Sequence, residues 1–428
     1  MAVQSVLALL LLSVAAAASA DSGDRVITVT NMCNQVIRVG HTGGECRNSS
    51  PTFKCTETGC PEGLTCNPAD FNCYWDIPPP ENNRSLDLEP KSAITLRIST
   101  PEQSCYDPKT NTALVIKWSG NIWGATGCDV GKGACETAIC YDGNITNNGH
   151  CSTYQGPSGP VTRAEFTLMN EGLDTYDVTI LGGINIPVEM KPNITSNTKS
   201  AEEAGIKGVA AYYWCGNPGG VMASNRNLSD CTWEFALYNI TGFGNESILL
   251  PLVAKNSSGN ANCSEHTDCA DKEFCGTLEQ LNDISGGPEP NLFPQKCGRL
   301  IGLWNANGIC KWAAGVSDLS KFPNTYPFRC MERTGQMSAD DTFASLYGCS
   351  GLYATSGYLP NPPNPSIVCG CPTWKDEGIN APPVSMCQAY NTVWGNSSLP
   401  WIEWMKRGCP TSYVYPFDDE SSTFQCPH

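Results

Sequence analysis

Residues 162–168 read Thr-Arg-Ala-Glu-Phe-Thr-Leu, and residues 174–178 read Asp-Thr-Tyr-Asp-Val. Short runs of this kind, rich in β-forming residues and bounded by turn signals, predict strands at Ala164 to Leu168 and Tyr176 to Ile180. Comparable runs predict four more strands: Val26 to Thr30, Val36 to Val39, Ala93 to Ile98 and Ala113 to Trp118. Helical periodicity is scarce, and the chain holds 41 glycines and 31 prolines. We therefore expect a mainly β fold, a sandwich or barrel with long loops.

Two segments are predicted to be helical. These are Ser200 to Ile206, and Leu399 to Lys406, which carries Trp401 and Trp404 on one face.

The chain contains 25 cysteines, which are useful as cross-links only in an oxidising compartment. Its first residues agree, because the apolar run Val6 to Val14 is followed by Ala18-Ser19-Ala20, a small-x-small sequence that signal peptidase accepts. We expect residues 1–20 to be a signal peptide and residues 21–428 to be exported to the cell exterior or the cell wall. Ten Asn-x-Ser/Thr sequons predict a glycoprotein.

The formal net charge is −16, with only 26 Lys and Arg residues. Nucleic acids and anionic membrane surfaces both attract basic proteins, so neither is expected as a partner. An acidic surface is compatible with a neutral polysaccharide, and it equally serves solubility at acidic pH.

Two stretches share a similar cysteine spacing, one from Cys55 to Cys73 and one from Cys263 to Cys275. Each is predicted to be a small knuckle held by disulfides, because it has too few apolar residues to hold itself. His266 lies between Cys263 and Cys269, which leaves a zinc site as an alternative for the second stretch. An oxidising compartment favours disulfides, so no metal and no cofactor are expected.

Several motifs resemble, in order and spacing, those of the thaumatin-like proteins. The resemblance is carried by residues 27–33 (ITVTNMC), 122–128 (IWGATGC), 162–188 (from TRAEFTL to GINIPV) and 404–427 (from WMKRGCP to STFQCP). It covers about 150 residues near both ends. It is poor over 42–83 and 195–393, where this chain carries a cysteine-rich insert and a long insert region.

The resemblance implies an antiparallel β-sandwich with disulfide-rich loops packed on it. It also implies the pairs Cys128–Cys135 and Cys140–Cys151, and it pairs Cys409 and Cys426 with cysteines near Cys215 and Cys231. Family members usually close with one more strand, whose cysteine pairs with the equivalent of Cys33. With an odd number of cysteines, at least one is unpaired or intermolecular.

Thaumatin-like proteins often carry an acidic cleft of one arginine and four acids. Three acids match by position: Glu165, Asp177 and Asp418. The fourth acid falls at Gly182 and the arginine at Ser158, with Arg163 nearby but out of register.

Glycoside hydrolysis normally needs one protonated and one ionised carboxyl group. Glu165 is expected to be the acid, because it sits in an apolar strand beside Phe166 and Ala164. Asp177 is expected to be the base or nucleophile, with Asp418 adjusting the pair. Asp419, Phe166 and Trp123 are expected to contact the substrate, since aromatic faces stack on sugar rings.

The function that follows is binding and weak endo-hydrolysis of β-1,3-glucan in cell walls by a monomer. Three alternatives stay open. The protein could bind glucan without turnover, it could be a defence or structural interaction protein, or its cysteine-rich inserts could act as an inhibitor or toxin.

Overall fold

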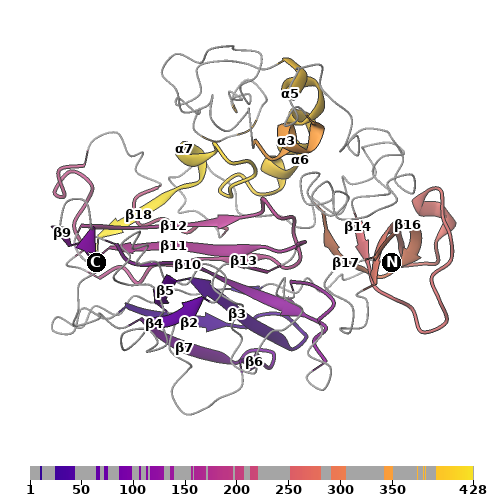
Figure 1. Ribbon diagram of the computed structural model, residues 1–428, viewed down its shortest axis with the longest axis horizontal. Helices are drawn as coiled ribbons and strands as arrows, with labels where there is room; N and C mark the ends of the chain where they lie inside the picture. Colours follow the sequence, from indigo (N-terminus) through magenta and orange to yellow (C-terminus); the bar gives the residue numbers. More distant parts are fainter. Residues whose placement is uncertain are drawn as a thin grey trace, which may run out of the picture.

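The structure is a computed structural model, shown in Figure 1. It describes residues 10–11, 25–43, 64–67, 72–75, 86–98, 106–107, 112–113, 116–129, 135–138, 156–157, 159–169, 172–195, 198–206, 213–219, 251–280, 291–304, 342–349, 374, 379, 381 and 392–427. Within these ranges, no helix combines the length and the apolar character needed to cross a membrane.

The centre of the molecule is a six-stranded antiparallel sheet, visible across the middle of Figure 1. Its strands, in spatial order, are β18 (Phe424–Pro427), β12 (Leu173–Thr179), β11 (Arg163–Met169), β10 (Ile116–Thr126), β3 (Ile37–Gly43) and β6 (Asp87–Leu88).

A second layer covers one face of this sheet. It is the antiparallel pair β2 (Arg25–Thr30) and β7 (Ala93–Ile98), on the lower side of the molecule in Figure 1. Apolar side chains from both layers form one continuous core: Ile27, Val29, Ile37, Val39, Ile94, Leu96, Ile122, Ala164, Phe166, Leu168, Tyr176 and Val178 are among its members. The predicted antiparallel β-sandwich is confirmed.

An ion pair also links the two layers. Arg25 Nε donates to Asp174 Oδ2 at 2.9 Å, and both side chains are nearly buried. Asp174 Oδ1 in turn accepts the backbone N–H of Met169 at 2.8 Å, and Arg25 donates to the Met169 carbonyl at 3.0 Å. The outer strand β2 is therefore attached to the β11–β12 turn by polar contacts as well as by the core.

A separate four-stranded sheet lies at one end of the molecule. Its order is β16 (Asn291–Gly298), β15 (Phe274–Gln280), β14 (Pro251–Val253) and β17 (Leu300–Leu303). Backbone hydrogen bonds between Ile184 and Leu303 connect it to the segment after β12.

Two disulfides, Cys263–Cys275 and Cys269–Cys297, hold the turns beside this second sheet, which also include the 3-10 turn η3 (His266–Asp268). The knuckle predicted for this stretch is confirmed, although its partner Cys297 lies outside the stretch. The sulfurs of Cys263, Cys269 and Cys297 lie within 4.8 Å of one another, but all of them are in disulfides, so the zinc alternative is wrong.

The helices are short and lie near the other face of the central sheet (Figure 1). They are α3 (Phe343–Tyr347), α5 (Thr392–Ser397), α6 (Leu399–Gly408) and α7 (Asp419–Ser422). The predicted helix at Leu399 is confirmed as α6, and Trp401 stacks on Trp404 with ring centroids 4.5 Å apart. Both tryptophans belong to a second core, rich in aromatic residues.

Six minor strands, in three pairs, complete the described β structure. The hairpin β4 (Leu64–Asn67) and β5 (Asn72–Trp75) lies within the predicted insert. β8 (Tyr106–Asp107) pairs with β9 (Thr112–Ala113). Within the expected signal peptide, β1 (Leu10–Leu11) runs parallel to β13 (Val188–Glu189).

Two local predictions are wrong. Residues 201–205 form a hydrogen-bonded turn instead of a helix. The predicted segment, Ser200 to Ile206, has seven residues. Because helix nucleation is costly, a segment of this length needs packing contacts to form a helix. The strand expected from Ala113 to Trp118 is divided, with Ala113 ending β9 and Ile116 beginning the longer strand β10.

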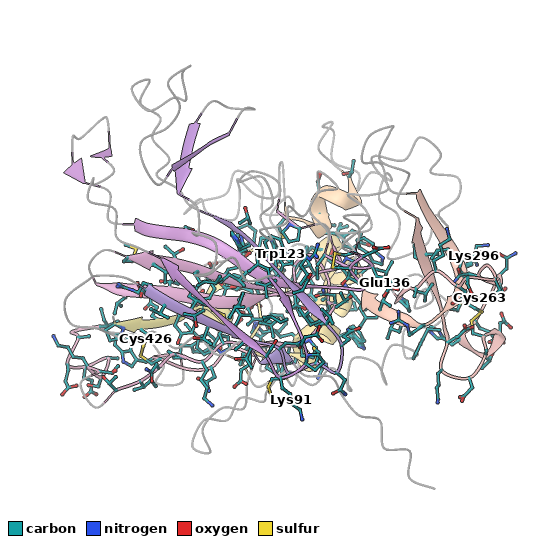
Figure 2. The ribbon with its side chains drawn as sticks, turned by 90° about the horizontal axis from the view of Figure 1, so that it is seen from below. Lys91, Trp123, Glu136, Cys263, Lys296 and Cys426 are labelled. Atoms are coloured by element: carbon teal, nitrogen blue, oxygen red, sulfur yellow. A yellow bond between two sulfur atoms is a disulfide. The ribbon has the colours of Figure 1, made fainter. Side chains whose placement is uncertain are left out.

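The cysteines follow the family pairing where the structure describes them. Cys128–Cys135 and Cys215–Cys426 are disulfides, and Cys409 is disulfide-bonded. Cys33 is a buried free thiol. Figure 2 places Cys426 and Cys263 toward opposite ends of the molecule, so the cross-links are spread along it. Cys140, Cys151 and Cys231 lie outside the described residues.

Replacing Phe166 by alanine should test which face of β11 meets the core. Phe166 is only 4% exposed in the sandwich core, so the Phe166→Ala variant should lose about 3–5 kcal/mol of unfolding free energy. Its neighbour Thr167 points to the opposite face, and Thr167→Ala should change stability by less than about 1 kcal/mol. Urea unfolding of the two variants checks this, and equal losses would contradict the assignment.

Candidate functional site

The candidate site lies on the face of the central sheet that points away from β2 and β7. Along β11 buried and half-buried residues alternate, with Ala164, Phe166 and Leu168 in the sandwich core. Because successive side chains of a strand point to opposite faces, Arg163 and Glu165 lie on the other side.

Strand register brings three polar residues into one row across this face. Glu165 is directly opposite Asp177 on β12 and directly opposite Asn121 on β10. Residues opposite each other in an antiparallel pair have Cβ atoms about 4.5–5.5 Å apart. The structure therefore brings together Glu165 and Asp177, two of the three acids predicted from the sequence.

Glu165 has a cationic neighbour on its own strand. Arg163 Nη1 lies 3.6 Å from Glu165 Oε1, and the two side chains are 23% and 33% exposed. The apolar neighbours Ala164 and Phe166 point into the core on the opposite face, so they do not desolvate the Glu165 carboxyl.

Asp177 is half-buried, and its Oδ1 atom is shielded from solvent. Among the residues that the structure describes, this atom has no hydrogen-bond partner. Burial raises the pKa of Asp177 well above its ordinary value, and the negative charges of Glu165 and Asp419 raise it further, while Arg163 opposes them. The neutral form of this carboxyl is thus stabilised.

Asp419 reaches this neighbourhood from α7, next to the segment that contains Tyr413. Backbone hydrogen bonds of 2.9 Å join Tyr413 N–H to the Val178 carbonyl and Ile180 N–H to the Tyr413 carbonyl. The Tyr413 hydroxyl donates to Asp419 Oδ1 at 2.7 Å. We call Glu165, Asp177 and Asp419 the acidic group.

Asp418, the third predicted acid, does not belong to this group. It is fully buried, and its Oδ2 accepts a hydrogen bond from Lys406 Nζ at 2.7 Å, with both side chains 0% exposed. Its carboxylate also accepts bonds from Ser421 and Ser422 and from the indole N–H of Trp374 at 3.2 Å. A carboxylate so enclosed cannot contact a polysaccharide in this structure.

Like Asp418, the Lys406 ammonium is surrounded by several hydrogen-bond partners. Besides Asp418, its Nζ lies 3.0 Å from the Ser412 carbonyl oxygen and 2.9 Å from the hydroxyl oxygens of Ser421 and Ser422, so its three hydrogens are shared among four acceptors. The ammonium lies 5.3 Å from the centre of the Trp374 ring. The pair joins α6 to α7 and to the loop between them.

Removing one partner of this buried pair should be strongly destabilising. A Lys406→Met variant leaves the Asp418 carboxylate buried without its cation, which should cost about 3–5 kcal/mol of unfolding free energy. Arg407 is exposed on the same helix, so Arg407→Met should cost less than about 1 kcal/mol. The test is the urea midpoint of both variants, and similar midpoints would show that the pair contributes little.

The two aromatic residues predicted to contact the substrate are both buried. Phe166 lies in the sandwich core, on the face opposite the acidic group. Trp123 is 0% exposed; it packs over Gly40, where a Cβ atom would collide with its ring, and its indole N–H donates to the Ala138 carbonyl at 3.1 Å.

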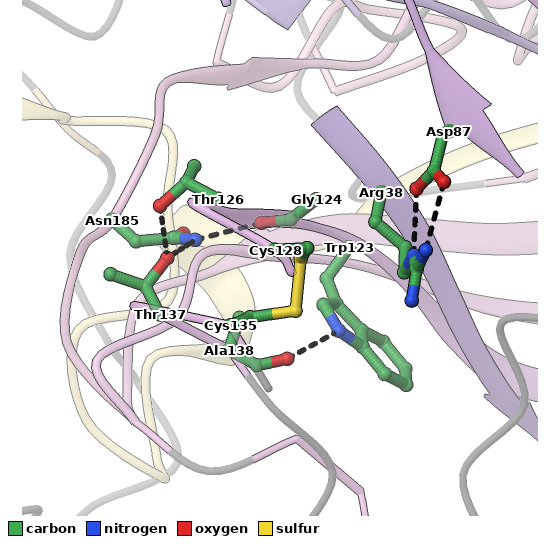
Figure 3. Close-up of a disulfide and its surroundings, with 10 residues drawn as sticks. All are labelled: Arg38, Asp87, Trp123, Gly124, Thr126, Cys128, Cys135, Thr137, Ala138 and Asn185. Carbon is green, nitrogen blue, oxygen red and sulfur yellow. Dashed lines mark hydrogen bonds and ion pairs between the residues drawn. A yellow bond between two sulfur atoms is a disulfide. The ribbon is translucent and has the colours of Figure 1, made fainter. Parts of the chain in front are cut away.

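Figure 3 shows why Trp123 is covered. Cys128, Cys135 and Ala138 lie against it, at the disulfide and just beyond it. Asn185 holds the residues on either side of the disulfide by donating to the Gly124 carbonyl at 2.7 Å and to the Thr137 hydroxyl at 3.0 Å. Neither Trp123 nor Phe166 presents a ring face on which a sugar could stack.

Sequence reasoning did not assign three residues of this site. Arg163 and Asn121 could have been found from the two-residue period of a strand, which puts them on the face of Glu165 once the register is known. Tyr413 carries no comparable signal, because its place beside Asp177 depends on a loop that follows α6.

The titration of Asp177 predicts how stability depends on pH. Below its unfolded-state pKa, near the ordinary value of 3.8, the carboxyl is neutral in both states and costs nothing. Because the folded pKa is higher, the native state binds more protons between the two values, and stability is lost as pH rises through the folded pKa.

An Asp177→Asn variant should therefore be more stable than the parent near pH 7, with the difference closing toward pH 3. Thermal unfolding across this pH range measures it, with Glu202→Gln on the exposed turn at 201–205 as control. A difference that is absent, or that widens at low pH, would contradict the burial of Asp177.

Comparison with known proteins matches residues 95–282 to the Thaumatin family model, a span that includes β10, β11 and β12. "Thaumatin-like protein 1" from Pyrus pyrifolia is 34% identical over 99 residues, covering 22% of this chain and 38% of that protein. "Thaumatin-like protein 1b" from Malus domestica is 40% identical over 79 residues, 18% and 35% of the two chains.

"Glucan endo-1,3-beta-glucosidase" from Prunus avium is 37% identical over 81 residues, 18% of this chain and 31% of that protein. "Pathogenesis-related protein 5" from Arabidopsis thaliana is 40% identical over 80 residues, 18% and 30% of the two chains. The chain spans about a third of the length of these curated relatives.

Proposed function

Because the chain belongs to the thaumatin-like family, we propose that it is an exported protein that binds β-1,3-glucan and hydrolyses it through the acidic group. The observation that carries the proposal is the pairing, on one face of the sheet, of an enclosed carboxyl with a partly exposed, cation-paired one. Hydrolysis of a glycosidic bond needs such a difference between two carboxyl groups. One relative is named a glucan endo-1,3-beta-glucosidase, and this name supports the choice of substrate class.

The roles proposed for the two carboxyls exchange those expected from the sequence. Asp177 is the proton donor, since its burial and its acidic neighbours favour the protonated form. Glu165 is the ionised partner, because it is a third exposed and lies beside Arg163.

In the reaction, Asp177 would give its proton to the glycosidic oxygen as the bond from that oxygen to the anomeric carbon breaks. Glu165 would attack the anomeric carbon or take a proton from the water that attacks it. Asp419 would act through its charge, and Asp418 would have a structural role only.

Polar side chains would bind the sugar in place of the buried aromatic rings. Asn121 has an enclosed Oδ1 without a hydrogen-bond partner, and it is next to Glu165 in the row. Thr167 and Thr175, directly opposite each other on β11 and β12, lie on the same face two residues further along. Amide and hydroxyl groups of this kind suit the hydroxyls of a neutral polysaccharide.

Hydrolysis is tested with purified protein and linear β-1,3-glucan, scored by released oligosaccharides. Glu165→Gln and Asp177→Asn should each lower the rate by about 10²–10⁴-fold, the usual contribution of such a group. Glu202→Gln, an exposed acid outside the site, should keep the parent rate. Since Asp177 must carry a proton, the parent rate should fall as pH rises through the raised pKa of that group.

A second candidate function is glucan binding or defence-type interaction without turnover, which the match to a pathogenesis-related protein favours. It predicts that the parent and both variants pellet equally with insoluble β-1,3-glucan and release nothing. If the protein does not pellet with the glucan and releases no oligosaccharides, both candidate functions on carbohydrate are refuted.

A further inference from the structure

The hydroxyl of Tyr413 makes two hydrogen bonds beside the acidic group. It donates to Asp419 Oδ1 at 2.7 Å and lies 2.6 Å from the Thr423 hydroxyl. Both distances are those of well-formed hydrogen bonds between oxygen atoms. Asp419 begins α7 and Thr423 follows its last residue, so one phenol oxygen bridges the two ends of that short helix.

The two bonds fix the direction of the protons. A tyrosine hydroxyl has a single hydrogen, and that hydrogen is used for the Asp419 carboxylate. The contact with Thr423 therefore runs from the threonine hydroxyl, which donates, to the Tyr413 oxygen, which accepts. Thr423, Tyr413 and Asp419 form a chain of hydrogen bonds that ends on the carboxylate, and a charge-assisted bond of this kind is stronger than a neutral one.

The segment around Tyr413 is anchored on both sides. Its backbone is hydrogen-bonded to Val178 and Ile180, which flank Thr179 at the end of β12. The next residue, Val414, donates its N–H to the buried Asp418 carboxylate at 3.3 Å. The phenol is thus fixed relative to the strand that carries Asp177.

We propose that Tyr413 is a positioning residue, which holds the Asp419 carboxylate within electrostatic range of Asp177. The assignment rests on the proposed role of Asp177 as proton donor and deepens it. Without the phenol, the Asp419 side chain could turn toward water, where its charge would act on Asp177 through a higher dielectric.

The charges around Asp177 agree with this role. Glu165 and Arg163 face it from β11, and Asp419 faces it from α7. Burial and the nearby charge of Asp419 raise the pKa of the Tyr413 phenol, so its proton stays in place for donation. Of the two acids that raise the pKa of Asp177, Asp419 is the one that the phenol holds.

The test follows the titration of Asp177 itself. In protein labelled with ¹³C-aspartate, the Asp177 carboxyl resonance is assigned by its loss in Asp177→Asn and followed by NMR over pH. In Tyr413→Phe its midpoint should move to lower pH, because one neighbouring negative charge has become more distant. Asp419→Asn, which removes that charge, should move it in the same direction.

The double variant shows whether Tyr413 acts through Asp419. If it does, Tyr413→Phe should add nothing to Asp419→Asn, so the two shifts are not additive. Tyr415→Phe is the matched control, because this nearby buried hydroxyl has no hydrogen-bond partner in the described part of the chain and its removal should leave the midpoint unchanged.

Three results would overturn the proposal. One is an unchanged midpoint in Tyr413→Phe, another is an unchanged midpoint in Asp419→Asn, and the third is fully additive shifts. Should Tyr413→Phe fail to fold, Thr423→Val removes the donor to the phenol and should move the midpoint in the same direction by a smaller amount, and no movement there would count against the proposal.

The NMR readout separates this proposal from the proposed function. Asp177 titrates whether or not the protein cleaves glucan, so an inactive parent with the expected midpoint shifts would refute hydrolysis alone. If the parent is active, the alkaline limb of its pH–rate profile should move to lower pH in Tyr413→Phe, which a purely structural role would not do.

Discussion

The buried ion pair between Lys406 and Asp418 is the constraint on which the candidate site depends. An ammonium and a carboxylate are costly to remove from water, and the cost is offset only when every donor and acceptor is engaged. Here the serine hydroxyls and a backbone carbonyl satisfy Lys406, while Asp418 accepts from serines, an indole and a backbone N–H. The requirement fixes the short helix α7, and with it the residue that follows Asp418.

In that arrangement, the two adjacent aspartates have different roles. Asp418 points inward and holds the helix, whereas Asp419 points to Tyr413 and the sheet. Because the two residues are neighbours in the chain, a sequence pattern alone cannot say which of them is free for chemistry. The position of Lys406 distinguishes the two aspartates, since its ammonium pairs with the carboxylate of Asp418.

The fold was largely predictable because strands leave a local signal. The runs at Val26, Ala93, Ala164 and Tyr176 become β2, β7, β11 and β12, and the tryptophan-bearing segment at Leu399 becomes α6. The composition of residues 201–205 favours a helix, whereas the structure has a turn there. Whether tertiary contacts support a helix cannot be read from a local sequence.

The site was predictable only in part. Glu165 and Asp177 could be named from the sequence, yet the chemistry expected of each depends on which face its neighbours occupy. Adjacency in the sequence suggests that Phe166 surrounds Glu165, but strand geometry sends the Phe166 side chain to the opposite face. Trp123 departs from the prediction for a different reason, since it packs against Cys128, Cys135 and Ala138 and donates its indole N–H to the Ala138 carbonyl.

The free thiol of Cys33 has a consequence for the cross-linked state of the protein. It is 1% exposed, and burial raises its pKa to about 11. Exchange between thiols and disulfides requires a thiolate that can reach a sulfur atom, and at neutral pH this residue supplies almost none. In the part of the chain that the structure describes, folding therefore keeps this free thiol from attacking a disulfide.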